Sequence, residues 1–148
     1  MARKLILLSL ALGLGLAVTG VAGASWFNVI RGTRGDDVIA GTAGPDFVLS
    51  FAGIDQVTTG DGRDIVYAGK GNDTVDGGAQ FDRLFGGPGN DRMHAVFPDN
   101  QVDTIDCGAG YDVAFLNKNE HDLTDDCEVI RYVTPRASAN ESADTDDR

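Results

Sequence analysis

The chain has 148 residues, with 23 acidic and 12 basic side chains and a formal net charge of −11 at pH 7. This length accommodates one domain. The surplus of negative charge repels nucleic acid and anionic membrane surfaces, so we expect neither of them as a partner.

Residues 1–24 have the features of a secretory signal peptide. Arg3 and Lys4 precede a mostly apolar run over residues 5–21, and the small residues Ala22-Gly23-Ala24 then predict cleavage before Ser25. An uncleaved membrane anchor is the alternative, but an anchor needs about 20 apolar residues, and glycines interrupt this run at three places. Cleavage would leave a secreted, extracellular protein with a net charge of −13 and no membrane contact.

Residues 25–31 carry four apolar side chains, those of Trp26, Phe27, Val29 and Ile30, just before a series of repeats. The open end of a repeat protein exposes an apolar cross-section and an unpaired edge, which a terminal segment usually covers. We therefore expect residues 25–31 to form an N-terminal cap.

An aspartate recurs every nine residues between residues 32 and 94. The series consists of Asp37, Asp46, Asp55, Asp64, Asp73, Asp82 and Asp91. An apolar residue follows each aspartate two positions later, and a glycine precedes it by two positions everywhere except at Gln80. A fixed short period is typical of a solenoid. Each block therefore predicts a glycine-rich turn followed by a short strand.

Strands this short cannot bury an apolar face alone, so they must stack in parallel on copies of themselves. The predicted fold is an all-β parallel solenoid with one apolar residue of each block pointing inward. These inward residues are Ile39, Val48, Val57, Val66, Val75, Leu84 and Met93.

Two of the blocks, AGKGNDTVD at residues 68–76 and GGPGNDRMH at residues 86–94, resemble the RTX nonapeptide G-G-x-G-x-D-x-U-x, the haemolysin-type calcium-binding repeat. The resemblance covers residues 32–94, with weaker copies to residue 115. It is looser in the first three blocks, where Thr33, Thr42 and Phe51 replace the second glycine. It implies a parallel β-roll in which two nonapeptides form one coil, with Ca²⁺ between stacked turns.

In this family, each Ca²⁺ ion is bound by two successive turns on the same edge. The first turn supplies the backbone carbonyls of motif positions two and four and its aspartate. The next turn supplies the carbonyls of positions one and three and its aspartate. The resemblance thus implies one site made by Gly69, Gly71, Asp73, Gly86, Pro88 and Asp91. It implies another made by Gly60, Gly62, Asp64, Gly77, Ala79 and Asp82. Asp37, Asp46 and Asp55 extend the same two columns, and counting neighbouring turns gives about five Ca²⁺ ions.

Oxygen ligands of this kind suit Ca²⁺, which takes about six to eight oxygens from carboxylates and carbonyls. In the alternative, the solenoid binds no metal and its aspartates only cap turns through hydrogen bonds to the backbone. Stacked carboxylates would then repel one another. Five divalent ions would instead nearly neutralise the chain, so we expect folding to depend on the metal.

The nine-residue phase is interrupted by an insertion at residues 95–101 and resumes at Asp103 and Asp112, which places Ile105 and Ala114 inward. Whether this later coil binds Ca²⁺ is left open by the sequence, because Gln101 replaces a glycine. We assign the repeats to residues 32–115, a C-terminal cap to residues 116–134 and a disordered tail to residues 135–148.

Two cysteines, Cys107 and Cys127, lie in the part of the chain expected to be exported. In an oxidising compartment we expect them to form a disulfide that pins the C-terminal cap. Zinc binding would need four ligands, and His121 is the only histidine between them.

No catalytic constellation accompanies the repeats: the sequence has two histidines, no Gly-x-Ser-x-Gly elbow and no phosphate-binding loop. We expect a monomeric calcium-binding protein that is not an enzyme and is similar to small secreted bacterial members of the RTX family. The alternative is a calcium-dependent adhesion or cell-envelope module that binds an extracellular protein or glycan. Such a module needs an exposed aromatic patch, whereas we expect Phe47, Tyr67, Phe81 and Phe85 to be scattered.

Overall fold

The structure is a computed structural model that describes residues 4–6 and 27–134. The expected signal peptide therefore lies outside the described residues apart from its short segment Lys4–Ile6, and the expected C-terminal tail lies outside them altogether. No helix within the described ranges is long and apolar enough to cross a membrane.

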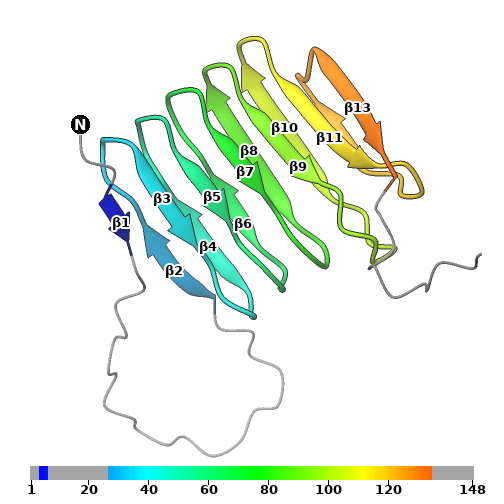
Figure 1. Cartoon of the computed structure of the whole chain (residues 1–148), viewed down its shortest axis with the longest axis horizontal. Coiled ribbons are helices and arrows are strands. Elements are labelled where there is room, and N and C mark those ends of the chain that lie inside the picture. Colours follow the sequence, from blue (N-terminus) through cyan, green and yellow to red (C-terminus); the bar gives the residue numbers. More distant parts are fainter. Residues whose placement is uncertain (1–3, 7–26, 135–148) are drawn as a thin grey trace, which may run out of the picture.

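Two parallel sheets form the long sides of a flattened solenoid (Figure 1). In spatial order, the seven-stranded sheet contains β1 (Lys4–Ile6), β3 (Asp37–Ala40), β5 (Gln56–Thr58), β7 (Thr74–Asp76), β9 (Arg92–Ala95), β11 (Val113–Asn117) and β13 (Val129–Val133). The six-stranded sheet contains β2 (Asn28–Arg31), β4 (Asp46–Leu49), β6 (Ile65–Tyr67), β8 (Arg83–Pro88), β10 (Thr104–Ala109) and β12 (Leu123–Asp125). The predicted all-β parallel solenoid is confirmed.

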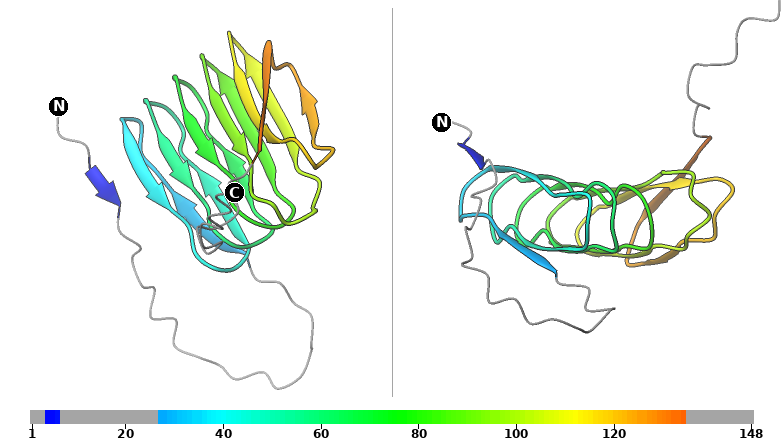
Figure 2. Two further views of the ribbon diagram at one scale, coloured as in Figure 1. Left: turned by 45° about the vertical axis from the view of Figure 1, so that its right-hand side comes forward. Right: turned by 90° about the horizontal axis from the view of Figure 1, so that it is seen from below.

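From β2 onward, consecutive strands alternate between the two sheets, so two nonapeptides make one coil (Figure 2). Each strand pairs in parallel with the strand two positions later in the chain, as Val38 with Gln56 and Phe47 with Ile65. The segment expected as an N-terminal cap contributes β2, which pairs with β4. The segment expected as a C-terminal cap contributes β12 and β13, which pair with β10 and β11.

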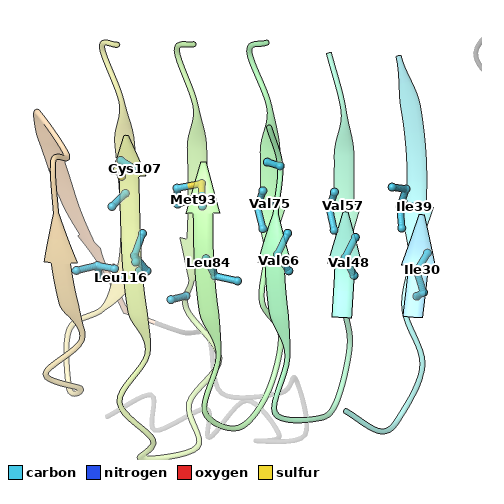
Figure 3. Packing of buried hydrophobic residues seen from close by; sticks show 14 residues of the cluster. Ile30, Ile39, Val48, Val57, Val66, Val75, Leu84, Met93, Cys107 and Leu116 are labelled. Atoms are coloured by element: carbon cyan, nitrogen blue, oxygen red, sulfur yellow. The ribbon is translucent and has the colours of Figure 1, made fainter. Parts of the chain in front are cut away.

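The core consists of two stacks of inward side chains, one from each sheet (Figure 3). All seven predicted inward residues are buried, and six of them, Val48, Val57, Val66, Val75, Leu84 and Met93, are 0 % exposed. Ile105 and Ala114 continue the stacks beyond the insertion, also at 0 % exposure. The core is narrow, because each strand from β2 to β8 contributes a single buried hydrophobic residue and β9, β10 and β11 contribute two each.

The turns that join the sheets lie along two edges. At the first edge, which is uppermost in Figure 1, the chain passes from the six-stranded to the seven-stranded sheet, and at the second edge it passes back. We number the turns of the seven nonapeptides in chain order. Turns 1, 3, 5 and 7 lie at the first edge and cover residues 32–37, 50–55, 68–73 and 86–91. Turns 2, 4 and 6 lie at the second edge and cover residues 41–46, 59–64 and 77–82.

Turns 3 to 7 share a backbone conformation that turns 1 and 2 lack. Their second residues, Phe51, Gly60, Gly69, Gly78 and Gly87, have φ between 76° and 103°. Their fourth residues, Gly53, Gly62, Gly71, Gln80 and Gly89, have φ between 77° and 151°. The corresponding residues of turns 1 and 2, Thr33, Gly35, Thr42 and Gly44, do not have positive φ. The repeat therefore contains two kinds of turn.

The last coils keep the register despite the insertion. Arg83 of β8 pairs with Thr104 of β10, a separation of 21 residues where earlier coils have 18. The three extra residues lie in the connection over residues 96–103. A disulfide joins Cys107, at the end of the buried part of β10, to Cys127, as expected.

Three aromatic side chains gather on the outer face of the six-stranded sheet. The rings of Tyr67 and Phe85 are stacked with centroids 4.6 Å apart, and Phe47 lies 5.8 Å from Tyr67 in a tilted arrangement. The expectation of scattered aromatic residues is wrong for these three, because the register places Tyr67 directly beside Phe85 on neighbouring strands. Phe81 lies apart from them, under the guanidinium group of Arg63.

Candidate metal centre

Two columns of aspartates run along the solenoid, one at each edge. The first-edge column contains Asp37, Asp55, Asp73, Asp91 and Asp112, and the second-edge column contains Asp46, Asp64, Asp82 and Asp103. None of these side chains is more than 5 % exposed. Successive residues of a strand face opposite sides, so each aspartate faces the same side as the apolar residue two positions later. The pattern that builds the core therefore buries the carboxylates as well.

In the aspartates of turns 3 to 7, one oxygen, Oδ1, accepts a hydrogen bond from the backbone of the preceding coil. On the first edge, the N–H groups of Asp37, Asp55 and Asp73 donate to Oδ1 of Asp55, Asp73 and Asp91 at 2.9, 2.8 and 2.8 Å. On the second edge, those of Asp46 and Asp64 donate to Asp64 and Asp82 at 2.8 and 2.9 Å. The capping hydrogen bonds expected of a metal-free solenoid are therefore present, and Oδ1 accepts them.

The other oxygen, Oδ2, is buried without any hydrogen-bond partner in most of the aspartates. The residues concerned are Asp55, Asp64, Asp73, Asp82, Asp91, Asp112 and Asp122. Burial of a charged oxygen without a partner costs several kcal/mol. A cation between the turns would remove this penalty, so the columns fit a hard, oxygen-binding metal ion.

Burial also raises the pKa of these carboxyl groups. Desolvation is the largest cause, and neighbouring carboxylates add to it, raising the pKa of Asp55 to about 6, of Asp91 to about 7 and of Asp82 to about 9. Desolvation likewise raises the pKa of Asp64 and Asp73. Without a cation, Asp82 therefore holds a proton at neutral pH, and a cation would compete with that proton.

The carbonyl groups expected to bind each ion belong to adjacent turns that are joined by hydrogen bonds. The N–H groups of Gly69 and Gly71 donate to the carbonyl oxygens of Gly86 and Pro88 at 2.9 and 3.0 Å. In the other site, Gly62 donates to Ala79 at 3.1 Å, and Ala79 donates to Gly60 at 2.9 Å. A carbonyl oxygen has two lone pairs, so these contacts leave each acceptor able to bind a cation. The ligand role of these residues stays a prediction.

Side chains alone do not complete a metal site in the described part of the chain. No three His, Cys, Asp or Glu side chains within residues 4–6 and 27–134 gather closely enough to hold a metal ion. Each ion would therefore combine carboxylates of neighbouring coils with backbone carbonyls, as the resemblance implies.

Turns 1 and 2 provide hydrogen-bond donors to their own aspartates, and Asn28 of β2 also donates its side-chain N–H to Oδ1 of Asp46 at 3.0 Å. The N–H of Thr33 donates to Oδ2 of Asp37 at 2.5 Å, and the Thr33 hydroxyl lies 3.1 Å from both carboxylate oxygens. Thr42 makes the same contacts with Asp46, at 2.7 Å from its N–H and at 3.1 and 3.3 Å from its hydroxyl. The sequence interpretation missed this role, although a threonine four residues before each aspartate is a visible signal.

The aspartate columns also continue beyond the residues assigned to metal binding from the sequence. The N–H groups of Asp82 and Asp91 donate to Oδ1 of Asp103 and Asp112 at 2.8 and 2.6 Å. Those of Asp103 and Asp112 donate in turn to Asp122 and Glu128 at 3.0 and 2.7 Å. The resumed nine-residue phase at Asp103 and Asp112 signalled the first of these steps. Asp122 and Glu128 are out of phase, so no periodic pattern marks them.

Comparison with protein families finds one match, to the family described as the RTX calcium-binding nonapeptide repeat (4 copies), over residues 27–55, 49–84 and 70–95. Comparison with curated proteins and with solved structures gives no match. The matched residues run from the start of β2 to the end of β9 and contain all seven turns. We therefore identify residues 27–95 as RTX calcium-binding nonapeptide repeats.

Proposed function

We propose that this protein is exported, binds several Ca²⁺ ions between its stacked turns and folds because of them. The observation that carries the proposal is the row of buried Oδ2 atoms without a partner in turns 3 to 7. The donor set supports Ca²⁺ over softer metals, since both columns offer carboxylate and carbonyl oxygens. The family match supports the same ion. The proposed role is binding and structural, with no catalytic step.

The two oxygens of each aspartate have separate tasks in this proposal. In turn 5, Oδ1 of Asp73 fixes the backbone N–H of Asp55, and Oδ2 of Asp73 is left for the metal. Asp73 and Asp91 would supply carboxylates to the site between turns 5 and 7, and the carbonyls of Gly69 and Pro88 are among its expected donors. Bound calcium supplies the positive charge that offsets the desolvation and the mutual repulsion of the carboxylates.

Occupation of successive sites would be coupled along each column. A carboxylate held in place by one site also holds the N–H of the preceding coil, so each ordered coil prepares its neighbour. The narrow core strengthens this dependence, because few apolar side chains oppose the repulsion when the metal is absent. We expect folding and calcium binding to occur together and cooperatively.

A titration with circular dichroism tests the calcium part of the proposal. Addition of Ca²⁺ to the chelated protein should give a cooperative gain of β structure. Mg²⁺ should not replace it, because that ion demands near-ideal octahedral geometry and loses its water reluctantly. If the chelated protein already has its full β structure and does not respond to Ca²⁺, the aspartates act only as turn caps.

Export is a separate part of the proposal and rests on residues 1–24. Protein recovered outside the producing cells should begin at Ser25 when its N-terminus is sequenced. Recovery of the chain with residues 1–24 attached to a membrane fraction would favour the anchor instead.

A calcium-dependent binding module is the second candidate, and the aromatic cluster on the six-stranded sheet favours it. Tyr67 and Phe85, with Leu49, Phe51 and Pro88, line an open apolar groove of about 340 Å³. Pull-down of cell-envelope proteins and glycans by the wild type, but not by Tyr67→Ala, and only with calcium, would support this role. Equal recovery by both proteins would count against the groove as the binding surface.

A further inference from the structure

We propose that Thr33 and Thr42 take the place of a cation in turns 1 and 2, so that ion-bridged pairs of turns begin only at turn 3 on the first edge and at turn 4 on the second. The inference rests on the proposed calcium binding and specifies which turns take part in it. It removes Asp37 and Asp46 from the expected metal ligands.

The contrast between turn 1 and turn 5 carries this inference. In turn 1, the second residue, Thr33, directs its N–H and its hydroxyl at the Asp37 carboxylate. In turn 5, the second residue, Gly69, has φ of 103° and directs its N–H at the carbonyl oxygen of Gly86 in the next coil. Oδ2 of Asp73 in turn 5 consequently has no donor and is completely buried. In these two turns, the direction of one backbone N–H decides whether Oδ2 of the aspartate has a backbone donor.

The carbonyl groups of turns 1 and 2 lead to the same conclusion. Gly35 and Gly44 occupy the fourth motif position, whose carbonyl is expected to bind an ion shared with the next turn on the same edge. Each of these oxygens instead lies 3.3 Å from the hydroxyl of the threonine in its own turn. Turn 1 thus offers turn 3 no carboxylate oxygen without a donor, and its fourth-position carbonyl lies against the threonine hydroxyl. Turn 2 stands in the same relation to turn 4.

The place of these turns in the solenoid explains why they differ. Turns 1 and 2 are the first repeat turns at their edges, so an ion bound outside them would have repeat ligands on one side only. The N–H and the hydroxyl of a threonine stabilise such a terminal carboxylate without a metal. The first bridged pairs are then Asp55 with Asp73 and Asp64 with Asp82, and the expected pairs Asp37 with Asp55 and Asp46 with Asp64 hold no ion.

The number of bound ions per chain tests the proposal, measured by calorimetric titration and by equilibrium dialysis against Ca²⁺. Asp37→Asn and Asp73→Asn are a matched pair in the same column, at the same motif position and both buried. We expect Asp37→Asn to bind as many ions as the wild type and Asp73→Asn to bind at least one fewer. Circular dichroism in excess Ca²⁺ verifies that each variant is folded, and Asp46→Asn with Asp82→Asn repeats the comparison on the second edge if a first-edge variant fails to fold.

A gain of binding provides the converse test. Thr33→Gly removes the hydroxyl and allows positive φ at the second position, so this variant should bind about one ion more than the wild type. Loss of an ion in Asp37→Asn, or an unchanged count in a folded Thr33→Gly protein, would overturn the role of the threonines while leaving calcium binding intact. A wild-type chain that binds no Ca²⁺ would overturn the proposed function and this inference together.

Discussion

Two glycines at the same motif position should respond in opposite ways to replacement by alanine. Gly71 is the fourth residue of turn 5 and has φ of 135°, a conformation that is strained for any residue with a Cβ. A Cβ there would overlap the carbonyl oxygen of Gly53 and lie 2.7 Å from its carbonyl carbon. Gly44 is the fourth residue of turn 2, does not have positive φ, and has nothing within 4 Å of the corresponding position.

The magnitudes follow from these surroundings. In Gly71→Ala, the backbone strain costs about 1–3 kcal/mol. Separating the coils to relieve the overlap would also break the hydrogen bonds from Gly53 to Lys70 and from Gly71 to Pro88, each worth about 1 kcal/mol. We expect a total loss of about 3–5 kcal/mol. Gly44→Ala should instead stabilise the fold by about 0.4–1 kcal/mol, because alanine restricts the unfolded chain.

Urea unfolding in excess Ca²⁺, followed by circular dichroism, measures both effects. The midpoint of Gly71→Ala should fall steeply, or the protein should not fold, while that of Gly44→Ala should stay level or rise slightly. Similar losses in the two variants would show that turns 2 and 5 have the same conformation in solution. The distinction between the two kinds of turn would then be wrong.

Three further predictions concern pH, the disulfide and the core. Without metal, circular dichroism should show more β structure at about pH 5 than at about pH 8: burial raises the pKa of Asp82 to about 9 from 3.8, so the folded state keeps a proton that the unfolded chain has released. This contribution is full below about pH 4 and is lost as the pH rises towards 9, and more β structure at alkaline pH would contradict it. Replacement of Cys107 and Cys127 by serine opens a loop of 20 residues and should lower the free energy of unfolding by about 3 kcal/mol. The reduced wild type should unfold at the same urea concentration as the variant. Equal midpoints for the oxidised and the reduced protein would contradict a stabilising role of the disulfide. Leu84 is 0 % exposed, so Leu84→Ala should lower the free energy of unfolding by about 2–5 kcal/mol. Leu123 is 62 % exposed, so Leu123→Ala should change the free energy of unfolding by less than about 0.5 kcal/mol. Comparable losses of stability in the two variants would place Leu84 outside the core.

The sequence determined the coil and its core. A period of nine residues with one aspartate and one apolar residue at fixed positions fixes the register of the stacked blocks, because any shift would expose the apolar residues and misalign the turns. That two nonapeptides form one coil was implied by the resemblance to the RTX repeat. The seven predicted inward residues are accordingly buried, and the resumed phase at Ile105 and Ala114 continues the stacks. The pairing of the two cysteines was also visible, since the chain contains no third.

The tertiary structure decided which aspartates lack a partner. Thr33, Thr42 and Phe51 all replace the same glycine of the motif, and the sequence treats them alike. In the structure, Phe51 adopts φ of 76° as the glycines do, whereas the two threonines turn their donors onto the carboxylates of their own turns.

The tertiary structure also decided which aromatic residues meet on the outer face. Tyr67 and Phe85 are in contact because residues 18 positions apart become neighbours across coils. A periodic sequence specifies which residues stack. The backbone torsion of each turn, and the side chains that stacking brings together, decide which donors and acceptors remain free, and these are properties of the folded coil.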